Sequence, residues 1–373
     1  MFVDCCRRLP PQPQRQSVSP SIRVEVQMRT TQRRFTGKIF MIHSCCLLLI
    51  GSQLMAPTSG MAEWSVSAES YLFYTDDAAL FSSTRRLARN QDPTQPIIDR
   101  PLAEQGEDVV YEPAARVTKS FGSPGSQTEV SVRGQGFLFA DNGRFNHGTL
   151  GVQVTQELSA ETKVGVRYFY GPDLFLGKNE VRAPVVGPEE ELKDEKVTTH
   201  FWSGGIAHRV HEDLTIILYG RYGLRRYTDA FDQRNTDFWT IGTHLEWEAC
   251  DHVELALGYH YERGLADGRK QPLLKDDISY FNHFVTAELT IELLKELSLE
   301  FALDYERNGF TTGIAGDERN GEHEDVVSGD ISLVYELTDA AALTTGFQGA
   351  HRKESFEEGL RNLNVWFGGR ILF

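Results

Sequence analysis

The sequence predicts an all-β protein: a transmembrane, antiparallel, up-and-down β-barrel of about 14 strands. Beyond residue 62, the chain contains successive runs in which apolar and polar residues alternate with a period of two, and it shows no sustained period of 3.6 residues. Short turns alternate along the chain with mostly longer polar loops. The last run ends the chain on an aromatic residue, Phe373. Together these features favour a barrel over a soluble sheet.

The first 62 residues are predicted to be a leader that is removed. A basic segment at 33–38 precedes an apolar core at 39–50, which suits a secretory signal and is too short for a membrane-spanning helix of about 20 residues. Small residues near Ala62 predict cleavage after that residue. The predicted domains are therefore a leader with a signal peptide, 1–62, and a barrel, 63–373.

The composition suits a membrane barrel and argues against nucleic-acid binding. The net charge is -15, whereas a nucleic-acid partner requires a basic surface. The mean hydropathy of -0.36 is too low for a helical membrane protein, but it fits a barrel in which only alternate residues face lipid. Of five cysteines only Cys250 lies in the predicted barrel, and no CxxC spacing occurs. We therefore expect no disulfide, no metal and no cofactor.

The alternating runs follow one another in a regular order. The predicted strands span residues 64–74, 109–119, 128–139, 147–158, 163–170, 197–210, 214–227, 238–249, 253–263, 278–291, 297–305, 326–337, 342–351 and 363–373. The longest predicted loops are 75–108 and 171–196, and either could fold inward and narrow a pore. An even strand count puts both chain ends on the short-turn side, as in barrels with short periplasmic turns and long extracellular loops. A soluble sandwich would instead have turns of mixed length at both ends.

The closing strand has one apolar face and one mostly polar face. The apolar parity includes Phe373, Ile371 and Phe367. A terminal Phe suits the aromatic girdle at a membrane interface, and we interpret these three residues as an assembly signal for the barrel-assembly machinery. The alternative is a buried edge strand of a soluble β-protein.

If the apolar parity faces lipid, the other parity lines the lumen, and its charges separate into two arcs. The basic arc comprises Arg116, Arg133, Arg167, Arg221, Arg225 and Arg370. The acidic arc comprises Glu246, Glu254, Glu262, Glu288, Glu300 and Asp304. Opposed arcs would set a transverse field that selects polar or charged solutes. The alternative is that these charges are solvated, or form cross-strand ion pairs that brace the wall.

Two histidine–glutamate pairs are the best candidates for an enzyme site. His244 with Glu246, and His260 with Glu262, are two residues apart on adjacent predicted strands, and such a cluster could bind a metal or act as acid and base. No serine is clearly placed beside either histidine, and neither GxSxG nor HExxH occurs. We therefore interpret these residues as lumen polar groups that pair across strands, and predict no enzymatic activity.

The predicted mature chain resembles the β-barrel porins of Gram-negative outer membranes. The likeness rests on the cleavable signal, the first strand leading into 74–77, the strand–turn–strand unit within 117–139, and the terminal Phe373. It is architectural and carries over no functional residue. The resemblance implies export to the outer membrane, contact with its lipid and lipopolysaccharide, and a channel for small polar or charged solutes; a homo-oligomer is compatible with it. The alternatives are a barrel that exports a surface polysaccharide or other polymer, and a barrel hydrolase.

Overall fold

The computed structural model describes residues 63–81, 106–122, 126–181, 192–355 and 359–373. The predicted leader and its cleavage site lie outside the described residues, as does the Ser/Gly turn at 123–125. Within these ranges no helix is both long enough and apolar enough to cross a membrane.

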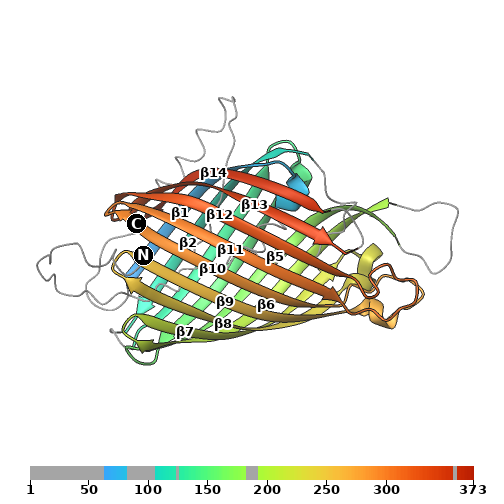
Figure 1. The fold of residues 1–373 in the computed structure, drawn as a ribbon, viewed down its shortest axis with the longest axis horizontal. Coiled ribbons are helices and arrows are strands. Elements are labelled where there is room, and N and C mark those ends of the chain that lie inside the picture. Colours follow the sequence, from blue (N-terminus) through green and yellow to red (C-terminus); the bar gives the residue numbers. More distant parts are fainter. Residues whose placement is uncertain (1–62, 82–105, 123–125, 182–191, 356–358) are drawn as a thin grey trace, which may run out of the picture.

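Fourteen antiparallel strands form one closed barrel, which confirms the predicted fold class (Figure 1). Each strand pairs with its neighbours in the sequence, and the first pairs with the last. The strands are β1 (Glu63–Thr75), β2 (Asp108–Phe121), β3 (Thr128–Phe139), β4 (His147–Glu157), β5 (Thr162–Glu180), β6 (Leu192–His211), β7 (Leu214–Tyr227), β8 (Thr236–Cys250), β9 (Val253–Ala266), β10 (Tyr280–Leu294), β11 (Leu297–Phe310), β12 (His323–Thr338), β13 (Ala341–Glu354) and β14 (Leu360–Leu372).

Alternation decides which side chains face outward. In β14, Phe367 is 53% exposed, whereas its neighbour Trp366 is 4% exposed. The same alternation of exposed apolar and buried side chains recurs in the other strands, as a wall with an apolar exterior requires. We call the side opposite the exposed apolar residues the inner face. In β8, Phe238 is 1% exposed and lies on the inner face, while Trp239 points outward.

One end of the barrel carries the tight turns and both ends of the described sheet. The hairpin turns after β6, β8, β10 and β12 contain only two residues each between the strands. β1 begins and β14 ends at this end of the barrel, where Phe373 N–H donates to the Val66 carbonyl at 2.8 Å. The alternating-length pattern in the sequence therefore located the short-turn end correctly.

The predicted loop 171–196 is instead mostly strand. β5 continues to Glu180 and β6 begins at Leu192, so that this hairpin extends beyond the neighbouring strands (Figure 1). The register shifts twice along it, between Gly171 and Leu174 and between Phe175 and Gly177. Each shift interrupts the period of two that marks a strand, which explains why the alternation ended at Tyr170 in the sequence.

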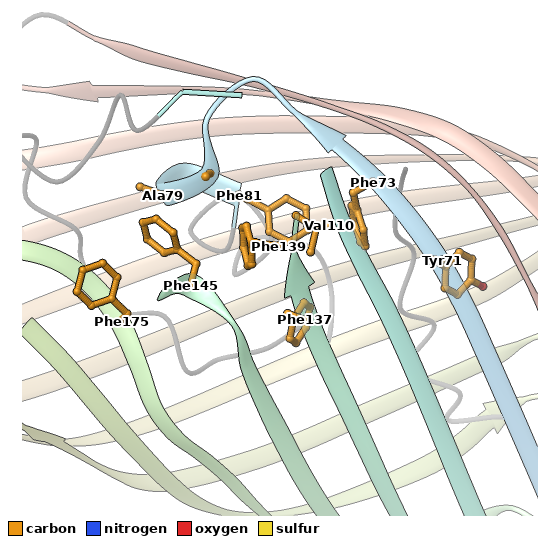
Figure 2. Packing of buried hydrophobic residues seen from close by; sticks show 10 residues of the cluster. Tyr71, Phe73, Ala79, Phe81, Val110, Phe137, Phe139, Phe145 and Phe175 are labelled. Atoms are coloured by element: carbon orange, nitrogen blue, oxygen red, sulfur yellow. The ribbon is translucent and has the colours of Figure 1, made fainter. Parts of the chain in front are cut away.

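The segment after β1 turns inward at the long-loop end. A single helical turn, 78–81, follows Asp77, whose Oδ1 accepts hydrogen bonds from the N–H groups of Ala79 (2.9 Å) and Leu80 (3.3 Å). Phe81 is fully buried and lies edge-on to Phe73, with ring centroids 4.5 Å apart. Figure 2 shows this aromatic cluster against the inner face. The start of the predicted loop 75–108 thus lines the barrel, while 82–105 falls outside the described residues.

Candidate functional site: the inner face

Arginines on β2, β3, β5 and β7 project from one side of the inner face. Arg116 stands directly across the register from Arg133. Two such like charges would repel, but both terminal nitrogens of Arg133 donate hydrogen bonds to the carboxylate of Glu69 on β1, at 3.0 and 2.8 Å. Glu69 was missed in the sequence, because nothing in its own strand indicates a partner two strands away.

The arginines alternate with aromatic rings across the strands. Phe201 on β6 lies between two arginines. Its ring centroid is 5.7 Å from the guanidinium carbon of Arg167 on β5 and 5.4 Å from that of Arg221 on β7. Arg225 continues the row at 4.4 Å from Phe238. These cation–π contacts hold the arginine stems flat against the wall.

Glu262 on β9 joins this basic side. Its carboxylate accepts hydrogen bonds from Arg221 Nη2 at 2.9 Å, from Thr240 Oγ1 at 2.6 Å and from the Tyr280 hydroxyl at 2.5 Å. Arg225 Nη2 lies 3.7 Å from Oε1 of Glu262, the oxygen that accepts from Tyr280. The sequence placed Glu262 in the acidic arc, but the structure ties it to two arginines of the basic arc.

Carboxylates gather on the inner face of β10, β11 and β12. Glu288 and Asp330 are the register partners of Ala302 on either side of β11. Asp304, two residues further along β11, has Thr286 and Ser328 as its register partners. Asp304 is 1% exposed and accepts a long hydrogen bond, 3.4 Å, from Ser328 Oγ. Asp330 was missed in the sequence, although its alternation with Ile331 was a usable signal. We call Glu288, Glu300, Asp304 and Asp330 the acidic cluster.

The remaining predicted residues lie nearer the ends of the strands. Glu246 and Glu254 share the inner-face parity close to the turn between β8 and β9. Arg370 on β14 donates to Glu336 on β12 at 2.9 Å. Phe367, Ile371 and Phe373 are exposed on the outer wall.

The structure brings the two candidate histidines into contact with each other, a contact that their predicted pairing with glutamates did not include. The Nε2 atoms of His244 and His260 are 2.7 Å apart, and the Tyr219 ring lies edge-on to His260. Glu262 is engaged by Arg221 instead. Among the described residues, no three His, Cys, Asp or Glu side chains are arranged as metal ligands.

A buried ionic network ties together the segments at the long-loop end. Arg234, at the end of the short helix η4 (Asp229–Arg234), donates Nε and Nη2 to the two oxygens of Asp276 at 2.8 and 2.9 Å. Its Nη1 reaches both oxygens of Glu195 on β6, and Arg319 from the loop after β11 reaches Asp276 at 3.3 Å. Burial alone would raise the pKa of Asp276, but Arg234, Arg319 and the amide of Gln233 outweigh it and hold that pKa below its usual value of 3.8.

Comparison with solved structures finds a similar barrel fold in outer-membrane proteins. No protein-family model and no curated protein matches the sequence. The outer membrane channel DcaP of Acinetobacter baumannii aligns with a TM-score of 0.50 and 8% identity, over 86% of this chain and 99% of that one. OmpT, an outer membrane protein of Vibrio cholerae, aligns with a TM-score of 0.45 and 10% identity, over 86% and 99% of the two chains. A bacterial polysaccharide outer membrane secretin aligns at 0.44 and 9% identity, over 85% and 100%. The alignment with DcaP shows that the chain has the barrel fold of that outer-membrane channel.

Proposed function

We propose that this protein is an outer-membrane channel that passes small polar or charged solutes between a basic and an acidic side of its lumen. The observation that supports it most is the sorting of charge on the inner face. Arginines project from β2, β3, β5 and β7, and the acidic cluster projects from β10 to β12. In a closed ring of 14 strands β11 is seven positions from β4, so the two groups are on opposite sides. Opposed charges of this kind orient dipolar solutes and favour ions of one sign near each wall.

Single-channel conductance of the refolded protein in a planar bilayer is the first test. The proposal predicts discrete current steps that grow with salt concentration. A fully folded barrel that conducts nothing would contradict it.

Ion selectivity then tests the charge arrangement, and Arg167 is the residue to change. Reversing Arg133 or Arg221 would place two carboxylates in contact, because each is ion-paired with a glutamate. Arg167 lies over the rings of Phe169 and Phe201, in the row of arginines on the basic side. By Coulomb's law a unit charge about 8 Å from a permeating ion in water contributes about 0.5 kcal/mol. Salt at about 0.15 M weakens this contribution by more than half.

Arg167→Glu changes the charge by two units and acts with opposite sign on cations and anions, so the cation-to-anion permeability ratio should rise by about three- to fourfold. Glu288→Gln should lower that ratio. Lys295→Glu is the matched control, because it changes the charge equally at a turn residue that is 90% exposed. The charge arrangement would be refuted if reversal potentials in a salt gradient moved as far in Lys295→Glu as in Arg167→Glu.

A further inference from the structure

Two imidazole rings meet on the inner face in a place that the backbone keeps open for them. His244 lies across the register from Gly258, and His260 lies across from Gly242. A Cβ at Gly258 would stand 3.0 Å from the His244 ring, and one at Gly242 would stand 2.8 Å from the His260 ring. The two glycines therefore provide the space in which the rings approach each other.

The rings meet tip to tip. Their Nε2 atoms are 2.7 Å apart, with ring centroids 4.8 Å apart. Two imidazolium groups cannot stand at that separation, because each Nε2 would then carry a proton and a positive charge. At least one Nε2 therefore presents a lone pair to the other, and the pair is held together either by one proton or by another cation.

A transition-metal ion is such a cation. Metal–imidazole bonds of about 2.0 Å at an angle of about 90° place two nitrogens about 2.8 Å apart, whereas a tetrahedral angle places them about 3.3 Å apart. The observed 2.7 Å is close to the first value. Tetragonal geometry with nitrogen and oxygen ligands is typical of Cu²⁺ and Ni²⁺, and Cu²⁺ binds most tightly of the divalent first-row ions.

The surroundings allow a cation to approach. The nearest basic side chain in this row, Arg221, is matched by Glu262 at 2.9 Å. Tyr219 and Phe284 lie against the His260 ring, with centroids 4.8 and 5.2 Å away, and hold it in place. We propose that His244 and His260 form a two-histidine binding site for Cu²⁺ or Ni²⁺ on the inner face. Water fills the remaining coordination positions, so the ion exchanges and the site is not needed for folding.

Copper binding by the purified, folded protein tests this proposal without any conductance measurement. After alkylation of the cysteines, the protein in detergent is titrated with Cu²⁺ and examined by electron paramagnetic resonance at one equivalent. We expect hyperfine structure from two nitrogen ligands. We also expect the Cu²⁺ affinity to fall by roughly tenfold or more in His244→Gln and in His260→Gln, with no further loss in the double variant, because a single imidazole cannot chelate.

His200→Gln and His283→Gln are the matched controls. Each of these histidines is on the outer wall and accepts or donates one hydrogen bond, 2.8 Å long, with a tyrosine hydroxyl. Their affinities should equal that of the unchanged protein. Equal affinities in the His244 and His260 variants would overturn the proposal, as would a spectrum with fewer than two nitrogens. The spectrum decides the matter even if a variant loses the heat-modifiable gel mobility of a folded barrel.

Discussion

Replacing Arg234 by methionine should destabilise the long-loop end of the barrel more than any other single change of an arginine there. Arg234 makes four short contacts to Asp276 and Glu195, whose side chains are 0% and 1% exposed. Methionine keeps much of the length of the side chain but removes the charge. Two carboxylates then remain buried, and Asp276 keeps Arg319 at 3.3 Å and the amide of Gln233 at 2.7 Å.

Removing one partner of a buried ion pair typically costs about 3–5 kcal/mol, because the remaining charge is left without compensation. We expect Arg234→Met to lower the free energy of unfolding by about 3 kcal/mol or more, measured by urea titration of the protein refolded into lipid vesicles. Amide hydrogen exchange should quicken first around η4 and the segment before β10, because the network connects these segments.

Arg226→Met is the matched control. Arg226 pairs with Asp237 at 2.7 Å, but the two side chains are 43% and 52% exposed. Exposed pairs contribute about 0–1 kcal/mol, so this change should be small. Adding Asp276→Asn to Arg234→Met should recover part of the loss, because it removes the stranded charge. The reasoning is refuted if Arg234→Met and Arg226→Met cost the same.

Two further predictions concern the same end of the barrel. The pKa of Asp276 is lower in the folded chain than in the unfolded chain. The ionised carboxylate therefore stabilises the fold fully above the unfolded value near 3.8, and this contribution is lost as pH falls through the folded value. Urea titrations between pH 7 and pH 3 should show the free energy of unfolding falling below about pH 4, and falling less steeply in Asp276→Asn. Phe81→Ala should lower the free energy of unfolding by about 3 kcal/mol or more, since it opens a cavity among Phe73, Phe139 and their neighbours; a loss below about 1 kcal/mol would mean that the cluster refills the space.

The sequence predicted the barrel well because a membrane wall repeats one simple rule. Each strand buries one parity and exposes the other, so a period of two revealed all 14 strands, although Glu69 and Asp330 were missed on the inner face. The rule fails where the period breaks. The shifts near Gly171 and Phe175 hid the outer part of β5.

The contacts on the inner face were harder to predict, because they depend on register. Glu69 and Arg133 are 64 residues apart and meet across an intervening strand. The contact between His244 and His260 follows from a diagonal pairing that a one-residue slip would abolish. The network around Arg234 joins loops whose paths follow no periodic rule. Chemistry-bearing residues could thus be assigned to a face, but not to partners.

We infer that the two interpretations of the inner-face charges, a transverse field and bracing ion pairs, apply to different parts of the ring. A basic and an acidic side of a closed barrel must share two boundaries, where residues of opposite charge become neighbours. One boundary lies between β7 and β9, where Glu262 binds Arg221. The other comprises β13, β14 and β1, and each of these strands pairs one residue with a nearby strand: Arg352 with Glu324, Arg370 with Glu336, and Glu69 with Arg133. Charges away from the boundaries, such as Arg167 and the acidic cluster, have like-charged residues on their side of the ring. For this reason selectivity should respond to Arg167, while stability should respond to the pairs at the boundaries.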